Sequence, residues 1–253
     1  MTKKIKSIFY TICAVILPII CCGCADKFIV GDRNLRRFPD YPFETVSLGA
    51  YAKAWYVPCS NAIGTAILLP GYKANRGYLI EFVDLWYSQQ FNVLLLDYRG
   101  YGDASGNPDF QGMVDDVHLA ITYARAKAPI VVLHGFSLGT MVAAKVATET
   151  QLNGCIFDGL ASTNGLGLTG LFLPSGMRTR TTVPKILIPK LFIHSIDDNV
   201  TVYKEAHYIY TIAKSPKSMY TTTGPHVLSY KFHPNEYGMV IRTWLKEVVN
   251  EYK

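Results

Sequence analysis

The sequence has few charged residues: Asp, Glu, Lys and Arg together make up 17%, whereas hydrophobic residues make up 49%. A chain with this balance can bury a packed core, which excludes an intrinsically disordered protein. It also lacks internal repeats, low-complexity tracts and breaks in composition, so its 253 residues are expected to form one large domain. No basic stripe interleaved with stacking aromatics stands out, and a nucleic-acid partner is therefore not indicated.

The sequence also lacks a cysteine pattern that would bind a metal ion. The spacing of the six cysteines does not match that of a metal site. Two of them, Cys59 and Cys155, lie beyond the first 24 residues. Cys155 opens an apparent buried strand, where we expect a free cysteine, although an oxidising compartment would permit it to pair with Cys59.

The amino terminus predicts export. Three lysines precede an apolar stretch, residues 8–20, which is short for a spanning helix and is followed by Cys21-Cys22-Gly23-Cys24. This end resembles a bacterial lipoprotein cleavage site, although Cys21 stands where leucine is usual. The resemblance implies an export segment over residues 1–24, a lipid on Cys24 and a location in the bacterial cell envelope. The alternative is an uncleaved N-terminal membrane anchor.

Cleavage would also change the charge of the protein. The formal net charge of the whole chain is +6, from 25 basic and 19 acidic residues. Loss of the three N-terminal lysines would leave 22 basic residues and a net charge of +3.

Beyond a polar linker over residues 25–42, residues 43–253 are expected to form the folded domain. Two strand-like runs, 43–48 and 51–57, predict an antiparallel hairpin. Six further runs predict strands at 65–69, 93–96, 130–133, 154–157, 190–193 and 217–221. Helical spacing of apolar residues follows at 110–124 and 237–248. Largely apolar strands separated by helices indicate an α/β fold: a mostly parallel central sheet with helices on both faces.

The clearest motif is Gly135-Phe136-Ser137-Leu138-Gly139, which stands between a strand and a helix. The chain must reverse so sharply there that only glycine fits at both flanks. Such a turn exposes the Ser137 hydroxyl at the end of the sheet and directs the helix N-terminus toward developing negative charge. The motif therefore predicts a nucleophilic serine.

A nucleophilic serine needs a base and a carboxylate to orient that base. Among six histidines, His226 alone lies in a turn-rich loop after the last strand and before the last helix, which favours it as the base. Asp197 and Asp198 follow the penultimate strand, and Asp158 follows the strand before it. The order serine, carboxylate, histidine along the chain favours Asp198, with Asp197 as the fallback.

Three ordered motifs resemble the signatures of α/β-hydrolase-fold serine hydrolases, and in particular small acyl hydrolases of the depalmitoylase-like type. They are residues 94–106, residues 134–139 and residues 193–200. The resemblance implies catalytic Ser137, Asp198 and His226, and an oxyanion hole formed by the N–H groups of Tyr72 and Leu138. It also implies no cofactor. Pro70-Gly71 stands where the family commonly has His-Gly, and this difference concerns the shape of the oxyanion loop.

Structural roles are expected for the residues near these motifs. Asn75 is expected to cap the next helix, and Asp97 with the glycines after it is expected to shape the loop beneath the elbow. Lys73 and Arg76 are expected at a solvated surface, with contact to an anionic substrate as the alternative.

The connection between the strands at 154–157 and 190–193 is too short for a large lid. Its apolar stretch, residues 165–174, including Leu171 and Phe172, is predicted to line an acyl groove or to touch a membrane, with Arg178, Arg180 and Lys185 near lipid headgroups. An ordinary connecting helix is the alternative.

Together these features predict a serine hydrolase that cleaves an ester or thioester of a small-molecule or lipid acyl substrate through an acyl-enzyme. A serine peptidase, a catalytically silent binding protein of the same fold and a purely structural lipoprotein remain as alternatives. Since His226 must be neutral to accept a proton, activity is expected to fall as the pH drops through about 6 to 7. The sequence does not indicate the acyl chain or the oligomeric state.

Overall fold

The computed structural model describes residues 29–163 and 174–252, and these form an eight-stranded sheet flanked by helices. The strands are β1 (Glu44–Leu48), β2 (Ala52–Val57), β3 (Gly64–Leu69), β4 (Phe91–Asp97), β5 (Ile130–Phe136), β6 (Gly154–Asp158), β7 (Lys190–Ser195) and β8 (Lys217–Thr222). The helices are α2 (Val83–Tyr87), α3 (Phe110–Arg125), α4 (Leu138–Val146), α5 (Thr179–Thr182), α6 (Tyr203–Ile212), α7 (Ser229–Phe232) and α8 (Pro234–Tyr252).

The strand order is β1-β2-β4-β3-β5-β6-β7-β8. The pairs β1–β2 and β2–β4 are antiparallel, and every other neighbouring pair is parallel. This confirms the predicted fold class, including the N-terminal antiparallel hairpin.

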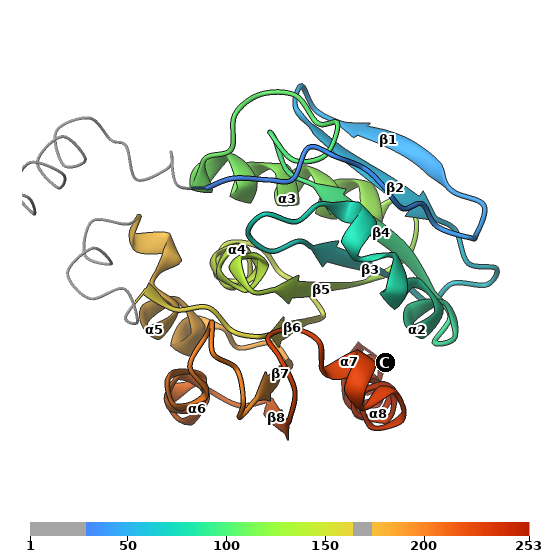
Figure 1. Ribbon diagram of the computed structural model, residues 1–253. Coiled ribbons are helices and arrows are strands. Elements are labelled where there is room, and N and C mark those ends of the chain that lie inside the picture. The colour runs from blue at the N-terminus through green and yellow to red at the C-terminus, as the bar shows by residue number, and fades with distance from the viewer. Residues whose placement is uncertain (1–28, 164–173, 253) are drawn as a thin grey trace, which may run out of the picture.

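Strands β3 to β7 are buried along their whole length because helices cover both faces of the sheet. One apolar cluster joins the sheet to α3, α4 and α6, and a second joins its other face to α2 and α8. Figure 1 shows the two layers, with α3 and α4 on one side of the strands and α2 and α8 on the other. The sheet is therefore the middle of a three-layer sandwich.

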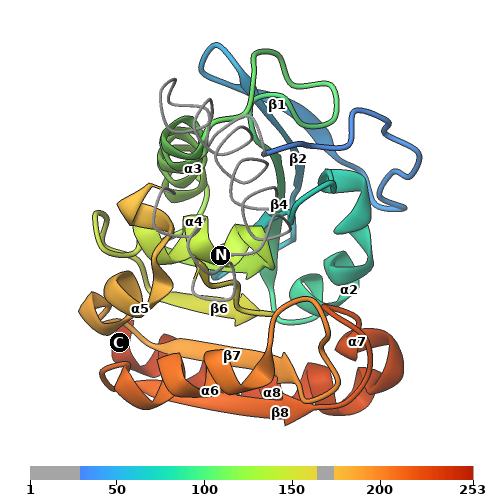
Figure 2. The same cartoon turned by 60° about the vertical axis from the view of Figure 1, so that its left-hand side comes forward.

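The register brings the loops of interest to one edge. Phe136 pairs with Asp158, and Ser195 pairs with Thr222, so adjacent parallel strands end level with one another. In Figure 2 the strands β6, β7 and β8 run side by side and point the same way. In open α/β sheets ligands gather outside the carboxyl ends of the strands, and this edge is where the candidate residues lie.

Residues 29–38 lie within the predicted polar linker. They contain no helix or strand, yet Ile29 is buried, and the backbone of Asp32 bonds to the loop after β3 and to the loop after β4. The Arg33 guanidinium donates to the carbonyl of Ala104 at 2.6 Å. The segment is therefore packed on the domain, and we refer to residues 29–38 as the N-terminal arm.

Two predictions fall outside the described residues: the export segment at 1–24 and the apolar stretch with Leu171 and Phe172. Within the described part of the chain, no helix has both the length and the hydropathy needed to cross a membrane.

Candidate active site

Ser137 occupies the sharp turn that the sequence predicts. It lies between β5 and α4 with φ 51° and ψ −116°, a backbone conformation that a residue with a side chain rarely adopts. Its N–H donates to the carbonyl of Asp158 at 2.9 Å, which fixes the turn to the end of β6.

The two glycines of the motif are required by space. A Cβ added to Gly135 would lie 2.5 Å from the carbonyl oxygen of Gly139, and one added to Gly139 would lie 2.3 Å from that of Leu69. Both separations are shorter than carbon and oxygen tolerate, and both obstacles are backbone. The mechanical interpretation of the motif is confirmed.

The loop after β3 lies against the serine. A Cβ added to Gly71 would lie 3.2 Å from the Cβ of Ser137. Tyr72 follows in this loop with an exposed side chain, and Leu138 is the first residue of α4, where backbone N–H groups lack carbonyl partners in a preceding turn. The loop and the helix start therefore flank Ser137, and the oxyanion roles of Tyr72 and Leu138 stay a prediction.

His226 and Asp198 contact each other as predicted. His226 Nδ1 lies 2.6 Å from Asp198 Oδ2, although the two residues are 28 positions apart. The Asp198 side chain is 1% exposed and that of His226 is 15% exposed. His226 Nε2 is buried and has no hydrogen-bond partner within the described part of the chain. With Nδ1 donating to the carboxylate, Nε2 carries a free lone pair, which is the state that a general base requires.

The end of β6 connects the histidine to the serine. Asp158 holds the Ser137 N–H, and the next residue is Gly159, at which an added Cβ would lie 2.9 Å from His226 Cε1. The imidazole and the elbow therefore both contact the segment Asp158-Gly159.

The electrostatics favour an ionised Asp198. Burial raises the pKa of this carboxyl, but it is outweighed by the hydrogen bond from His226, the N–H of Thr201, the charge of the imidazole and the N–H of Val200, which lower the pKa to about 2. Asp198 is therefore a carboxylate across the physiological range.

The other two carboxylates have different partners. Asp197 Oδ2 accepts from the N–H of Gly224 at 3.1 Å. Asp158 Oδ2 accepts from the Tyr237 hydroxyl at 2.7 Å, and burial raises the pKa of Asp158 to about 7. Among the described residues, Asp198 is the carboxylate that contacts His226, which favours it over the fallback Asp197.

Sequence reasoning missed two residues that surround Asp198. Thr201 donates both its N–H (2.8 Å to Oδ1) and its hydroxyl (2.9 Å to Oδ2) to the carboxylate. Buried His194 lies behind, with Nε2 2.8 Å from the carbonyl of Thr201 and 3.6 Å from Asp198 Oδ2. No short motif distinguishes this threonine, because its role depends on how the loop after β7 folds back.

The expectation that Arg76 is solvated is wrong. Arg76 is 1% exposed, its Nη1 lies 2.6 Å from Asp97 Oδ2 and 2.7 Å from Asp103 Oδ1, and its guanidinium stacks on Trp55 at 4.4 Å. The reason is that the Asp97 carboxylate is fully buried at the end of β4 and needs a counter-charge. Lys73 is exposed, as expected, and the structural role of Asp97 is confirmed.

The N-terminal cap of the segment after Tyr72 also agrees with the sequence. The Asn75 side chain accepts from the N–H of Gly77 at 2.9 Å and starts a short 3₁₀ helix, Arg76–Tyr78.

Cys155 is buried and free, as expected, and Cys59 is free. The described residues contain no group of three or more His, Cys, Asp or Glu side chains arranged to hold a metal ion.

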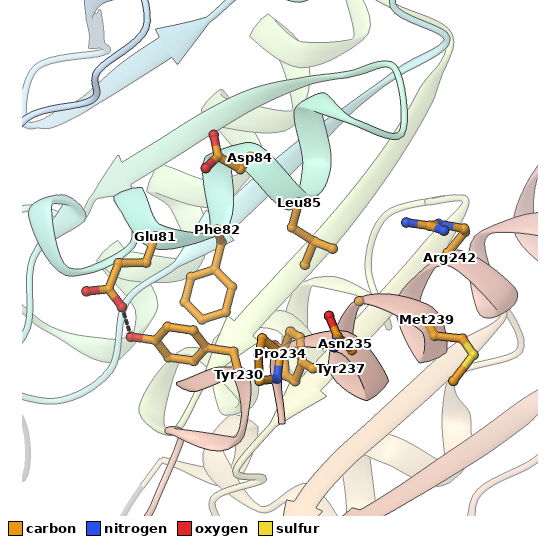
Figure 3. A pocket seen from close by; sticks show the side chains of 11 residues that line it. Glu81, Phe82, Asp84, Leu85, Tyr230, Pro234, Asn235, Tyr237, Met239 and Arg242 are labelled. Carbon is orange, nitrogen blue, oxygen red and sulfur yellow. Dashed lines mark hydrogen bonds between the residues drawn. The ribbon is translucent and has the colours of Figure 1, made fainter. Parts of the chain in front are cut away.

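A pocket of about 580 Å³ lies between α2 and α8. Figure 3 shows Glu81 and Tyr230 joined by a hydrogen bond at one end and Arg242 at the other. The Phe82 ring at its wall packs on that of Phe136, with centroids 4.5 Å apart. Ser137, Asp198 and His226 do not line it, so it belongs to the flank of the sheet rather than to the elbow.

Known proteins are similar to this chain in sequence and structure. Residues 60–165 match a family model described as serine aminopeptidase, S33. The uncharacterised protein YfhR of Escherichia coli (strain K12) is 28% identical over 194 residues, which cover 69% of this chain and 68% of that protein.

Two solved structures are similar in fold. The esterase Pf2001 of Pyrococcus furiosus superposes with a TM-score of 0.74 at 19% identity, over 87% of this chain and 98% of the other. An esterase from Exiguobacterium antarcticum gives a TM-score of 0.64 at 16% identity, over 80% and 98%. These comparisons confirm the resemblance to α/β-hydrolase-fold serine hydrolases.

Proposed function

We propose that this chain, which has the α/β-hydrolase fold, is a serine hydrolase that cleaves a carboxylic ester or thioester. The observation that carries the proposal is the His226–Asp198 pair. The buried Nε2 of His226, which has no hydrogen-bond partner among residues 29–163 and 174–252, lies next to the segment that holds the strained Ser137 elbow. A strained backbone and a preorganised base at one edge of a sheet are typical of a nucleophilic site.

In this mechanism the Ser137 hydroxyl attacks the carbonyl carbon while His226 Nε2 takes its proton. Asp198 stabilises the imidazolium that forms. The N–H groups of Tyr72 and Leu138 bind the oxyanion, each with an effect of roughly a hundredfold or more on the rate. The tetrahedral intermediate then expels an alcohol or thiol, which receives the proton from His226, and leaves an ester on Ser137. Water, activated by His226, hydrolyses that ester and releases the acid.

The direct test is hydrolysis of p-nitrophenyl esters of increasing chain length by the wild-type protein and by Ser137→Ala. We expect turnover by the wild type and a loss of at least about a thousandfold in the variant. Folded protein that hydrolyses no ester, or a variant as active as the wild type, would reject the proposal. The chain-length dependence would identify the preferred acyl group.

A serine peptidase is the second candidate, since the matching family model is described as an aminopeptidase. The same three residues would serve amide cleavage. Aminoacyl anilides offered beside the esters would separate the two, because a peptidase turns over both the anilides and the esters, whereas an esterase turns over the esters alone. The esterase names of the two structural relatives favour the ester.

We also propose that the protein is exported and anchored to the bacterial envelope through a lipid on Cys24. Mass spectrometry of the mature N-terminus would identify a diacylglyceryl cysteine, and Cys24→Ala should leave a longer chain with an intact apolar segment. If the protein were only a structural lipoprotein, Cys24→Ala would abolish its cellular role while Ser137→Ala would have no effect.

A further inference from the structure

Several exposed apolar side chains lie on the segments that follow the strands of the candidate site. Five of them are 48% to 65% exposed and lie beyond the carboxyl ends of β3, β7 and β8. We call this set the apolar rim: Tyr72, Ile196, Val200, Val202 and Phe232. Exposed apolar side chains scattered singly are ordinary, but a set beyond the carboxyl ends of the strands at one edge points to an interaction surface.

Local contacts tie the rim to the site. The Val200 N–H donates to Asp198 Oδ1 at 2.8 Å, and Tyr72 follows the glycine that lies against Ser137. A Cβ added to Gly224, two residues before His226, would lie 3.2 Å from the Phe232 ring. Whatever covers these side chains therefore also covers the entrance to the site.

The N-terminal arm reaches the same edge. The Lys73 N–H donates to the carbonyl of Val30 at 2.8 Å, and the Asp32 N–H donates to the carbonyl of Ala74 at 3.1 Å. These bonds fix the arm to the loop that begins with Gly71 and Tyr72. In Figure 1 the blue trace of the arm begins on the side of the sheet where β5 gives way to α4.

The length of chain before the arm limits how far the site can lie from an anchor at Cys24. Five peptide steps separate Cys24 from Ile29, which is buried on the domain. Even fully extended, five residues span at most about 18 Å. A lipid on Cys24 would therefore hold Ile29 within about 18 Å of the bilayer, and the loop after β3 follows closely, because the Lys73 N–H donates to the carbonyl of Val30. The amino edge of the sheet lies about 20 Å further along the six-residue strands.

We propose that the apolar rim docks on the surface of the lipid bilayer and that the site takes its acyl substrate from that bilayer. Two independent features support an orientation in which the carboxyl edge of the sheet faces the bilayer. They are the exposed apolar side chains and the attachment point of the arm, and both lie at that edge. Exposed Lys73, next to the rim, is placed to meet lipid phosphate. The inference rests on the proposed hydrolase function and on the proposed lipid anchor.

Tryptophan quenching by brominated lipid tests the docking directly, because the three native tryptophans, Trp55, Trp86 and Trp244, are all buried. We would place one new tryptophan at the rim, by Phe232→Trp, and in a second variant by Val200→Trp. The matched control is Leu187→Trp, at a side chain that is 64% exposed just before the start of β7, on the opposite edge. All three are made in the full, lipidated chain and reconstituted in phosphatidylglycerol vesicles with brominated phosphatidylcholine.

We expect the added fluorescence of the rim variants to fall at least about twofold in brominated vesicles and that of Leu187→Trp to stay unchanged. Equal quenching at the two edges, or quenching at neither, would overturn the docking proposal. Since this signal needs no turnover, it is independent of the hydrolase proposal. If the protein is inactive but its rim is quenched, the hydrolase proposal is refuted and the docking proposal is supported. If the protein is active but its rim is not quenched, the hydrolase proposal is supported and the docking proposal is refuted.

Discussion

Replacing Asp198 by asparagine should nearly abolish activity while leaving the fold in place. Asp198 Oδ1 accepts two backbone N–H groups, and Oδ2 accepts from His226 and from Thr201. Asparagine keeps one oxygen for the backbone donors but presents an NH₂ group to the imidazole. His226 Nδ1 must then accept, so the proton moves to Nε2 and the base can no longer take a proton from Ser137.

The size of the effect follows from two contributions. With Nδ1 and Oδ2 2.6 Å apart, the charge centres of an imidazolium and a carboxylate lie roughly 4 Å apart, and their attraction is about 4 kcal/mol at an effective dielectric constant of 20. Restoring the productive tautomer against the new hydrogen bond costs about 1.5 kcal/mol more. Since 1.36 kcal/mol changes a rate tenfold, we expect kcat/KM to fall by about 10³ to 10⁴.

The assay is the initial rate on a short p-nitrophenyl ester, with circular dichroism to confirm folding. Asp197→Asn is the matched control, because its carboxylate bonds to Gly224 rather than to His226, and we expect it to lose less than about tenfold. A folded Asp198→Asn protein with more than about a tenth of wild-type activity, or a larger loss at Asp197, would refute the reasoning.

Three further predictions concern the residues around the site. Thr201→Val removes a hydroxyl donor from the catalytic carboxylate and should lower kcat about tenfold, while Thr201→Ser should restore most of it; equal losses in the two variants would contradict this. Arg76→Met leaves a buried carboxylate without its counter-charge and should lower the free energy of unfolding in urea by about 3–5 kcal/mol, whereas exposed Lys73→Met should change it little. Burial raises the pKa of Asp158 to about 7, so the folded state retains a proton that the unfolded state releases above pH 3.8. Stability should therefore decrease as the pH rises from about 4 to about 7, and Asp158→Asn should remove that dependence from a series of Tm measurements; an unchanged dependence would place its origin elsewhere.

Much of the fold could be predicted because the strands carry their own signal. Residues 130–133 and 191–193 are apolar throughout, as is typical of strands buried on both faces, and each run lies within an observed strand. The elbow was predictable for a different reason, since two glycines around a serine at a strand end leave few other backbone paths.

Contacts between loops could not be predicted in the same way. Burial of Arg76 depends on Asp97, 21 residues away, and nothing in the local sequence distinguishes a buried arginine from a solvated one. The N-terminal arm shows neither helical nor strand periodicity, and its backbone bonds to the loops after β3 and β4 depend on no particular side chain, so the sequence could not predict them. Thr201 is likewise recognised only when the loop has folded back onto Asp198.

The central claim is that Ser137 is a nucleophile activated by His226. Peptide mapping after treatment with a fluorophosphonate probe tests it most directly, because the probe bonds covalently to an activated serine. The adduct is predicted on the peptide containing Ser137, and it should be lost in Ser137→Ala and formed far more slowly in His226→Ala. Folded wild-type protein that takes no label, or takes it on another serine, would contradict the claim.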